Sequence, residues 1–164
     1  MIDLKPLSCP LLIVLVEPEI PPNVGAISRI CACIGAPLVL CGPLTFDENH
    51  PKRRRAGLDY WDKVEKIYHP DFETFLAGHR GTCWFLSTKV GRSLYEARFS
   101  PGDALVFGSE SRGLPAALLA RHEATALRIP MIAGIRSLNV ANAAAIAAYE
   151  AVRQVHSLGL PAGI

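Results

Sequence analysis

The stretch from Gly108 to Gly113 holds residue types that could bind a ligand. It places a carboxylate, Glu110, and an arginine, Arg112, between two glycines. The stretch lacks both the Gly-x-Gly-x-x-Gly spacing of a dinucleotide fingerprint and the lysine of a phosphate loop. It is therefore either a ligand loop of another kind or a tight turn.

Arg29 is a second chemical candidate, because it stands among apolar residues such as Ile27, Ile30 and Cys33. A helix would place it on the same face as Gly25, four residues earlier. An arginine in such surroundings is more often a snorkelling or ion-paired structural residue than a catalytic one. An early helical glycine costs stability, which suggests that something approaches the backbone there.

A run of four cations precedes two aromatic residues, Tyr60 and Trp61. The cations are Lys52, Arg53, Arg54 and Arg55. Point charges for phosphates and flat faces for unstacked bases are what an RNA-facing surface needs. The competing interpretation is a solvated basic loop balanced by neighbouring carboxylates, namely Asp47, Glu48, Asp59 and Asp62.

Short apolar runs alternate with helical patterns along the chain. We expect strands over residues 11–16, 38–41, 64–68, 82–86, 104–107 and 126–129, and helices over residues 24–34, 72–77, 116–122 and 139–156. Asn23 should cap the first helix, and Gly35 should end it. This alternation predicts an α/β fold with a mostly parallel sheet flanked by helices.

Polar loops follow four of the expected strands. They cover residues 17–23, 87–89, 108–113 and 130–139. In a parallel sheet, ligands bind beyond the carboxyl ends of the strands. We therefore expect these loops to share one cleft.

The expected last helix is rich in alanine and free of proline and glycine. Ser137 or Asn139 could cap it. Its small side chains would let a neighbouring backbone approach closely, and Tyr149 is a candidate interface residue. The helix could equally pack within its own subunit.

Length and composition predict a single domain over residues 1–164. Half of the 164 residues are hydrophobic and 20% are charged, which is typical of a globular protein. No apolar run reaches membrane-spanning length and no signal peptide is evident, so we expect a cytoplasmic protein.

The five cysteines lack metal-site spacing, so we interpret all of them as small core residues. The net charge of +2 does not by itself indicate nucleic-acid binding.

Three motifs, in their order and spacing, resemble those of the SPOUT superfamily of RNA methyltransferases. The first is the Glu17–Gly25 turn with Arg29, the second is Phe107–Pro115, and the third runs from Ile129 to Asn142. Within the superfamily the chain is most similar to the tRNA wobble-nucleotide 2′-O-methyltransferases. The Arg54–Tyr60 string and the lack of an extra RNA-binding domain favour that family.

The resemblance implies a C-terminal trefoil knot, although knots are rare in proteins. It also implies S-adenosylmethionine as cofactor, with S-adenosylhomocysteine as product and no metal. The cofactor-binding residues implied are Leu86, Gly108, Glu110, Ile129, Ser137 and Leu138. At Leu86, Gly108 and Ile129 the contacts would be made by the backbone.

The resemblance further implies that Arg29 lies at the reacting hydroxyl, with Ser137 and Asn139 as orienting groups. Arginine is a poor formal base, so Arg29 could instead fix a phosphate or stabilise the developing alkoxide. For Glu110, an ion pair with Arg29 or Arg112 is an equal alternative to a substrate contact.

The expected substrate is tRNA, and the RNA-binding candidates are Lys52, Arg54, Arg55 and Tyr60. A homodimer is implied by the resemblance, because so short a chain has little room for both a cofactor cleft and an RNA footprint. The predicted activity is methyl transfer to the ribose 2′-hydroxyl of the wobble nucleotide, a cytidine or modified uridine. Alternatives are another tRNA position, ribosomal RNA, or a non-catalytic RNA-binding protein. A Rossmann-type enzyme is disfavoured because no glycine fingerprint follows the first strand.

Overall fold

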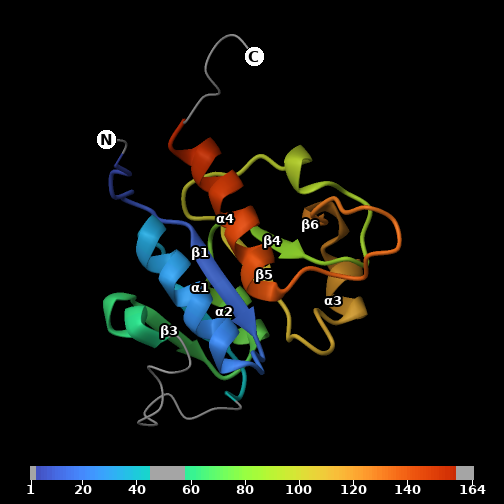
Figure 1. Ribbon diagram of the computed structural model, residues 1–164, viewed down its shortest axis with the longest axis horizontal. Helices are drawn as coiled ribbons and strands as arrows, with labels where there is room; N and C mark the ends of the chain where they lie inside the picture. Colours follow the sequence, from blue (N-terminus) through green and yellow to red (C-terminus); the bar gives the residue numbers. More distant parts are fainter. Residues whose placement is uncertain (1–2, 45–57, 158–164) are drawn as a thin grey trace.

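The computed structural model describes residues 3–44 and 58–157 and contains a six-stranded sheet (Figure 1). Every pairing in the sheet is parallel, and the strand order is β3-β2-β1-β5-β4-β6. The strands are β1 (Leu12–Val16), β2 (Leu38–Cys41), β3 (Lys66–His69), β4 (Cys83–Leu86), β5 (Ala104–Phe107) and β6 (Ala126–Leu127). The predicted α/β fold with a parallel sheet is confirmed.

Helices cover both faces of this sheet. They are α1 (Pro21–Ile34), α2 (Phe72–Gly78), α3 (Ala116–Arg121) and α4 (Val140–Val155). Short 3₁₀ helices lie at Leu58–Lys63, Leu94–Glu96 and Glu123–Thr125. Helices α1 and α4 lie side by side over one face (Figure 1).

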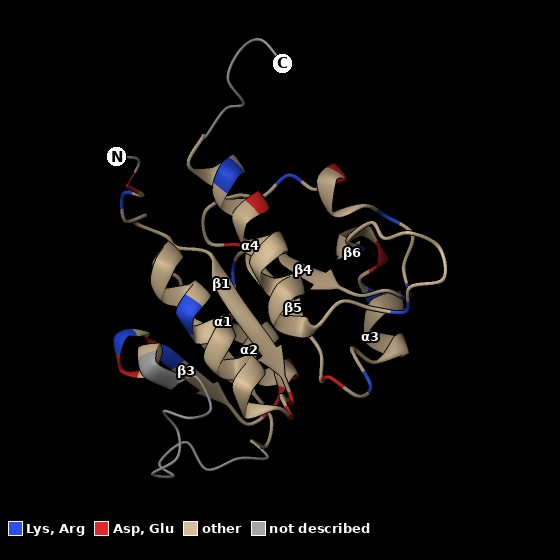
Figure 2. Ribbon diagram, in the orientation of Figure 1, with Lys and Arg blue, Asp and Glu red and all other residues tan. Residues whose placement is uncertain are grey.

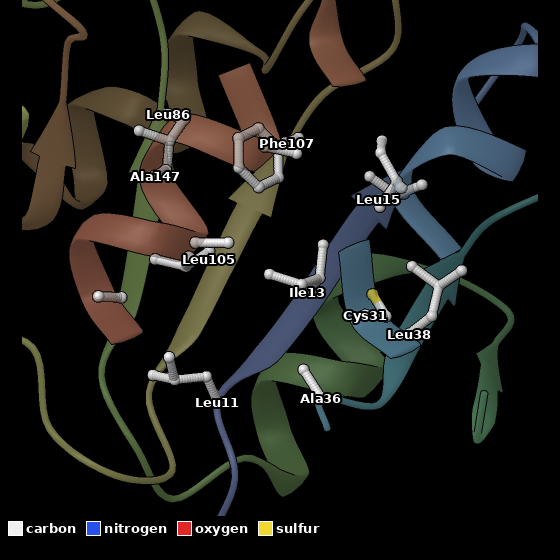
Figure 3. Close-up of a cluster of buried hydrophobic side chains, with 14 of the residues drawn as sticks. Leu11, Ile13, Leu15, Cys31, Ala36, Leu38, Leu86, Leu105, Phe107 and Ala147 are labelled. Atoms are coloured by element: carbon white, nitrogen blue, oxygen red, sulfur yellow. The ribbon is translucent and has the colours of Figure 1, made fainter. Parts of the chain in front are cut away.

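The central strands are apolar at every position because each face contributes to a separate core. Ile13 of β1 and Leu105 of β5 point into the cluster under α1 and α4, which Figure 3 shows together with Cys31 and Ala147. Val14 and Val106, the next residues along the same strands, belong to the cluster under α2 and α3. A three-layer architecture follows from this alternation.

The first helix begins earlier than predicted. It starts at Pro21, so two prolines occupy its first turn, where their missing N–H groups cost nothing. Ile20 is at the N-cap position without a side-chain hydrogen bond, so the prediction that Asn23 caps this helix is wrong. Gly35 ends the helix in the left-handed conformation at φ 67°, as predicted.

The last helix has the predicted extent, and its cap is Asn139 rather than Ser137. The Asn139 side chain accepts hydrogen bonds from the backbone N–H groups of Ala141 and Asn142. Four alanines are fully buried, so this helix packs closely within its own subunit. They are Ala144, Ala147, Ala148 and Ala151.

The cysteines are only partly core residues. Cys31, Cys41 and Cys83 are buried, and burial raises the pKa of the first two thiols to about 12 and that of the third to about 11. All three thiols therefore stay protonated and unreactive near neutral pH. Cys9 and Cys33 are exposed, so the prediction that all five are core residues is wrong for these two. Within residues 3–44 and 58–157, no cluster of His, Cys, Asp and Glu could hold a metal ion.

The centre of the sheet is formed by β1 and β5, which are neighbours although they are far apart in the sequence. From β1 the chain continues to β2 and β3 on one side, whereas β4 and β6 lie on the other side. A crevice at the carboxyl ends of two such strands is where open α/β sheets bind ligands. None of the helices described is long and apolar enough to cross a membrane.

Candidate active site

A cavity of about 630 Å³ lies at the carboxyl edge of the sheet. All four polar loops contribute to its lining, which confirms that they share one cleft. The six residues predicted to bind cofactor all line this cavity: Leu86, Gly108, Glu110, Ile129, Ser137 and Leu138. Its volume is in the range of small-molecule and cofactor sites.

The floor of the cavity is apolar and its rim is polar. Leu86, Phe107 and Leu114 belong to the floor and are at most 8% exposed. Ser87, Lys89 and other polar residues form the rim. A flat apolar ring could be buried against this floor while a charged group stays at the rim, so the lining fits a cofactor such as S-adenosylmethionine.

Gly108 is required by the close approach of the second half of its own loop. A Cβ atom at this position would lie 2.2 Å from the carbonyl carbon of Gly113 and 2.3 Å from the backbone nitrogen of Leu114. Gly113 itself has φ 66° and donates its N–H to the carbonyl of Ser109 at 2.8 Å. The two glycines therefore close a tight turn that holds Glu110 at its tip.

Glu110 joins this turn to the start of α1. Its carboxylate accepts hydrogen bonds from the backbone N–H groups of Glu19 and Ile20, at 2.8 and 3.2 Å, and from Nδ2 of Asn23 at 2.9 Å. Of the two alternatives for Glu110, the ion pair with Arg29 or Arg112 is not formed, since neither arginine forms a salt bridge with Glu110 among the residues described. Glu110 lines the cavity while it fixes two loops together.

The same two loops exchange a second set of contacts. The carboxylate of Glu19 accepts hydrogen bonds from the hydroxyl and the backbone N–H of Ser111, at 2.8 and 3.0 Å, and these bonds lower the pKa of Glu19. Arg112 forms a 2.6 Å ion pair with Glu17, whose backbone has φ 49°. A left-handed conformation is unfavourable for a residue other than glycine, so the surrounding contacts must hold it there.

Asn23 extends the network to α4, a role that its sequence position did not reveal. Its Oδ1 accepts a hydrogen bond from Nδ2 of Asn139 at 3.0 Å, and its own side chain is buried. Asn139 in turn caps α4 with its Oδ1. Glu110, Asn23 and Asn139 thus connect all three motifs, and Ser137 lies two residues before the cap.

Arg29 does not line the cavity of its own chain. It is exposed on α1, and its Cζ atom lies 4.8 Å from the centre of the Tyr60 ring. The ammonium of Lys63 lies 5.3 Å from the same ring. A predicted catalytic residue and a predicted RNA-binding residue therefore meet outside the cavity. The other RNA-binding candidates, Lys52, Arg54 and Arg55, lie outside the described residues.

Two cationic rim residues, Lys89 and Arg136, were not among the predicted site residues. Both lie within polar loops that were expected at the cleft, residues 87–89 and 130–139 respectively. The rule that ligands gather beyond strand ends placed their loops at the cleft, but it does not single out individual side chains.

Comparisons with known proteins agree with this geometry. Residues 10–149 match the model of the SpoU rRNA Methylase family. A tRNA (cytidine(34)-2′-O)-methyltransferase of Aeromonas hydrophila is 46% identical over 149 residues, which cover 90% of this chain and 96% of that protein.

Two solved structures have a similar fold. One, described in work on the 2-OH methylation of C/U34 on tRNA, has a TM-score of 0.83 and 47% identity, covering 91% of this chain and 98% of that one. The other is the SpoU methyltransferase AviRb from Streptomyces viridochromogenes with its cofactor AdoMet. It has a TM-score of 0.78 and 27% identity, covering 94% of this chain and 64% of that one. The RNA methyltransferase resemblance is confirmed, and the chain belongs to the SpoU rRNA methylase family.

Proposed function

We propose that this protein transfers a methyl group from S-adenosylmethionine to the ribose 2′-hydroxyl of the wobble nucleotide in the tRNA anticodon loop. The observation that carries the proposal is the convergence of three motif loops on one cavity through Glu110, Asn23 and Asn139. Relatives over 40% identical that are named for this reaction at cytidine 34 support the choice of substrate.

The cofactor site would be formed by the apolar floor and by the backbone at the strand ends. Leu86, Gly108 and Ile129 would contact the adenosyl group, and Ser137 and Leu138 would close the pocket over it. When bound, S-adenosylmethionine supplies a methyl group on a sulfonium, which a ribose oxygen can attack in line. The protein has to align the two groups and help to remove the hydroxyl proton.

The contacts within the site limit which residues can assist the reaction. The Glu110 carboxylate already accepts three hydrogen bonds, and the Asn139 side chain both caps α4 and donates to Asn23. We therefore assign positioning roles to both, and Ser137, which lines the cavity two residues before the cap of α4, is the hydroxyl that would orient the substrate. Arg29 would fix a phosphate or stabilise the developing alkoxide, as its permanent charge favours.

We propose that the active unit is a homodimer formed through the exposed face of α1 and α4. Ile146 is 37% exposed and Tyr149 is 51% exposed on α4, and Ile20 at the start of α1 is 43% exposed. Figure 2 shows few charged residues along either helix. Arg29 is exposed on α1 beside Tyr60, so we propose that a second copy brings its Arg29 to the cavity of the first.

We also propose a domain organisation and a cellular location for the protein. One domain would serve both cofactor and tRNA, with the basic segment Lys52–Arg55 on the RNA side. The trefoil knot stays a prediction from the family. A protein that modifies tRNA would act in the cytoplasm.

The direct test is transfer of labelled methyl from S-adenosylmethionine to total tRNA from a strain that lacks this protein, followed by mapping of the modified nucleotide. We expect label on the ribose of the wobble nucleotide. Label at another tRNA position, or only on ribosomal RNA, would overturn the substrate assignment. Failure to bind the cofactor at all would leave a non-catalytic RNA-binding protein.

A further inference from the structure

We propose that the turn from Ile132 to Arg136 holds the RNA nucleotide next to the one that is methylated. Arg136 would bind its phosphate, and the two isoleucines of the turn would contact its base. This inference rests on the proposed function and adds a substrate-positioning element to it. Contacts to phosphates fix the register of a nucleic acid, which a reaction at a single ribose requires.

The turn is short and is anchored at the cavity on both sides. The N–H of Ile135 donates to the carbonyl of Ile132 at 3.3 Å, and Gly134 between them has φ 90°. Met131 before the turn and Ser137 after it both line the cavity. Figure 1 shows the segment between β6 and α4 as an orange loop at the edge of the molecule.

The turn presents unusual apolar surface to solvent. Ile132 is 84% exposed and Ile135 is 58% exposed, and neither lines the cavity. A cofactor bound inside the cavity would therefore leave both side chains uncovered. An unstacked base is a flat apolar partner that could cover them from outside.

The charge at the rim favours an anion beside this turn. Three cations line the cavity, and one of them, Arg112, is neutralised by Glu17 at 2.6 Å and Glu19 at 4.0 Å. Among residues 3–44 and 58–157, Arg136 has no carboxylate within ion-pair distance. Its guanidinium can therefore bind a phosphate without first breaking an ion pair.

A cation and exposed apolar groups on one turn match a nucleotide better than they match the carboxylate of the cofactor. The carboxylate would account for Arg136 alone, whereas a nucleotide accounts for Arg136, Ile132 and Ile135 together. The two candidate anions, an RNA phosphate and the carboxylate of the cofactor, can be distinguished by experiment. Only binding of RNA would depend on the isoleucines and would weaken with salt as binding of a polyanion does.

The experiment compares two variants of the full-length protein, Arg136→Gln and Ile132→Ser, with two controls. Arg98→Gln removes an exposed arginine that does not line the cavity, and Tyr95→Ser removes an exposed apolar surface elsewhere. Affinity for a synthetic anticodon stem-loop RNA is measured over a salt series, and affinity for S-adenosylmethionine is measured by calorimetry.

We expect Arg136→Gln to weaken RNA binding about ten-fold at low salt and to reduce the salt slope by about one. Ile132→Ser should weaken RNA binding by a smaller factor and leave the salt slope unchanged, since it removes no charge. Ile132→Ser should bind the cofactor like the wild type, because Ile132 does not line the cavity, and Arg136→Gln should lose much less affinity for the cofactor than for RNA. The controls should match the wild type in every measurement.

Three outcomes would overturn the inference. Loss of cofactor affinity in Arg136→Gln with RNA binding unchanged would assign the anion to the cofactor carboxylate. A change of oligomeric state in Ile132→Ser, measured by light scattering, would assign the turn to a contact with a second copy. RNA binding unchanged in both variants would leave the turn without a role. If the wild type methylates no RNA, the proposed function fails independently of these results.

Discussion

Two regions of the molecule differ in how many of their side chains have partners within one chain. One is the edge of the sheet around the cavity, and the other is the outer face of α1 and α4. At the cavity, carboxylates and amides from three motifs are joined by hydrogen bonds through Glu110, Asn23 and Asn139. On the outer face, Ile146 and Tyr149 of α4 remain exposed.

This difference indicates that the cofactor cavity is already ordered in the free protein. A network whose members are mutually bonded holds the cofactor side rigid, so little ordering is needed on binding. The outer face of α4, by contrast, presents apolar and aromatic side chains, Ile146 and Tyr149, that a single chain leaves uncovered. A second copy of the chain would cover that face.

The largest expected effect is on the rate of methyl transfer, when Arg29 is replaced. Arg29→Ala should lower the methyl-transfer rate by roughly 10²–10³-fold, the usual loss when one charge-stabilising group is removed. Cofactor affinity should stay nearly unchanged, because Arg29 does not line the cavity. Single-turnover methyl transfer and calorimetry measure the two quantities.

The control for Arg29→Ala is Arg80→Ala, another exposed arginine that does not line the cavity. This variant should transfer methyl groups at the wild-type rate. An equal loss of cofactor binding and of activity in Arg29→Ala would contradict the division between the two regions.

The next largest effect is on the stability of the turn that lines the cavity at Gly108. Gly108→Ala places a Cβ atom 2.2 Å from a backbone carbon, so the turn must open or the protein must lose stability. We expect a loss of about 3 kcal/mol in the free energy of unfolding, together with weaker cofactor binding. Gly91→Ala is the matched control, because nothing lies within 4 Å of its Cβ position. Equal denaturation midpoints for the two variants would show that the turn is not closely packed.

Asn23→Asp tests the network itself and introduces a dependence on pH. It replaces the side-chain amide, one of the three donors to Glu110, with a second carboxylate, and a loss of about 2 kcal/mol at neutral pH is expected. Repulsion raises the pKa of the carboxylate pair in the folded state, so the folded protein binds protons more readily than the unfolded chain. The deficit should therefore shrink as the pH falls toward about 5. Urea unfolding at several pH values measures it, and a deficit that does not change with pH would exclude direct contact between the two groups.

The smallest expected effect concerns association of two copies. Tyr149→Glu adds a charge to the apolar face of α4 and should weaken the homodimer about ten-fold or more. Tyr95→Glu is the control, since Tyr95 is 57% exposed but lies on the 3₁₀ turn Leu94–Glu96 rather than on this face. Light scattering over a dilution series measures the dissociation. A monomeric wild type, or equal behaviour of both variants, would contradict the proposed interface.

The sheet could be predicted from the sequence because its strands are short, largely apolar and followed by polar loops. The rule that ligands lie beyond strand ends then placed four loops at one cavity. The start of α1 was predicted wrongly, because Asn23 resembles a cap while the two prolines before it already fit the first helical turn.

The partners of the site residues could not be predicted from the sequence. The residue types allow an ion pair of Glu110 with Arg29 or Arg112, yet Glu110 accepts hydrogen bonds from N–H groups some 90 positions earlier in the chain. Such contacts depend on the spatial order of the strands, which residue types alone do not give. Likewise, the motif that contains Arg29 does not show that this residue lies outside the cavity of its own chain.

The most direct test of the shared site uses a heterodimer of two inactive variants, Arg29→Ala and Asn139→Ala, co-expressed with different tags and purified through both. If the cavity of one copy is completed by Arg29 of the other, each heterodimer keeps one intact site, and about half of the wild-type activity is expected. An inactive heterodimer that still binds S-adenosylmethionine would show that Arg29 acts within its own chain, which would contradict the account.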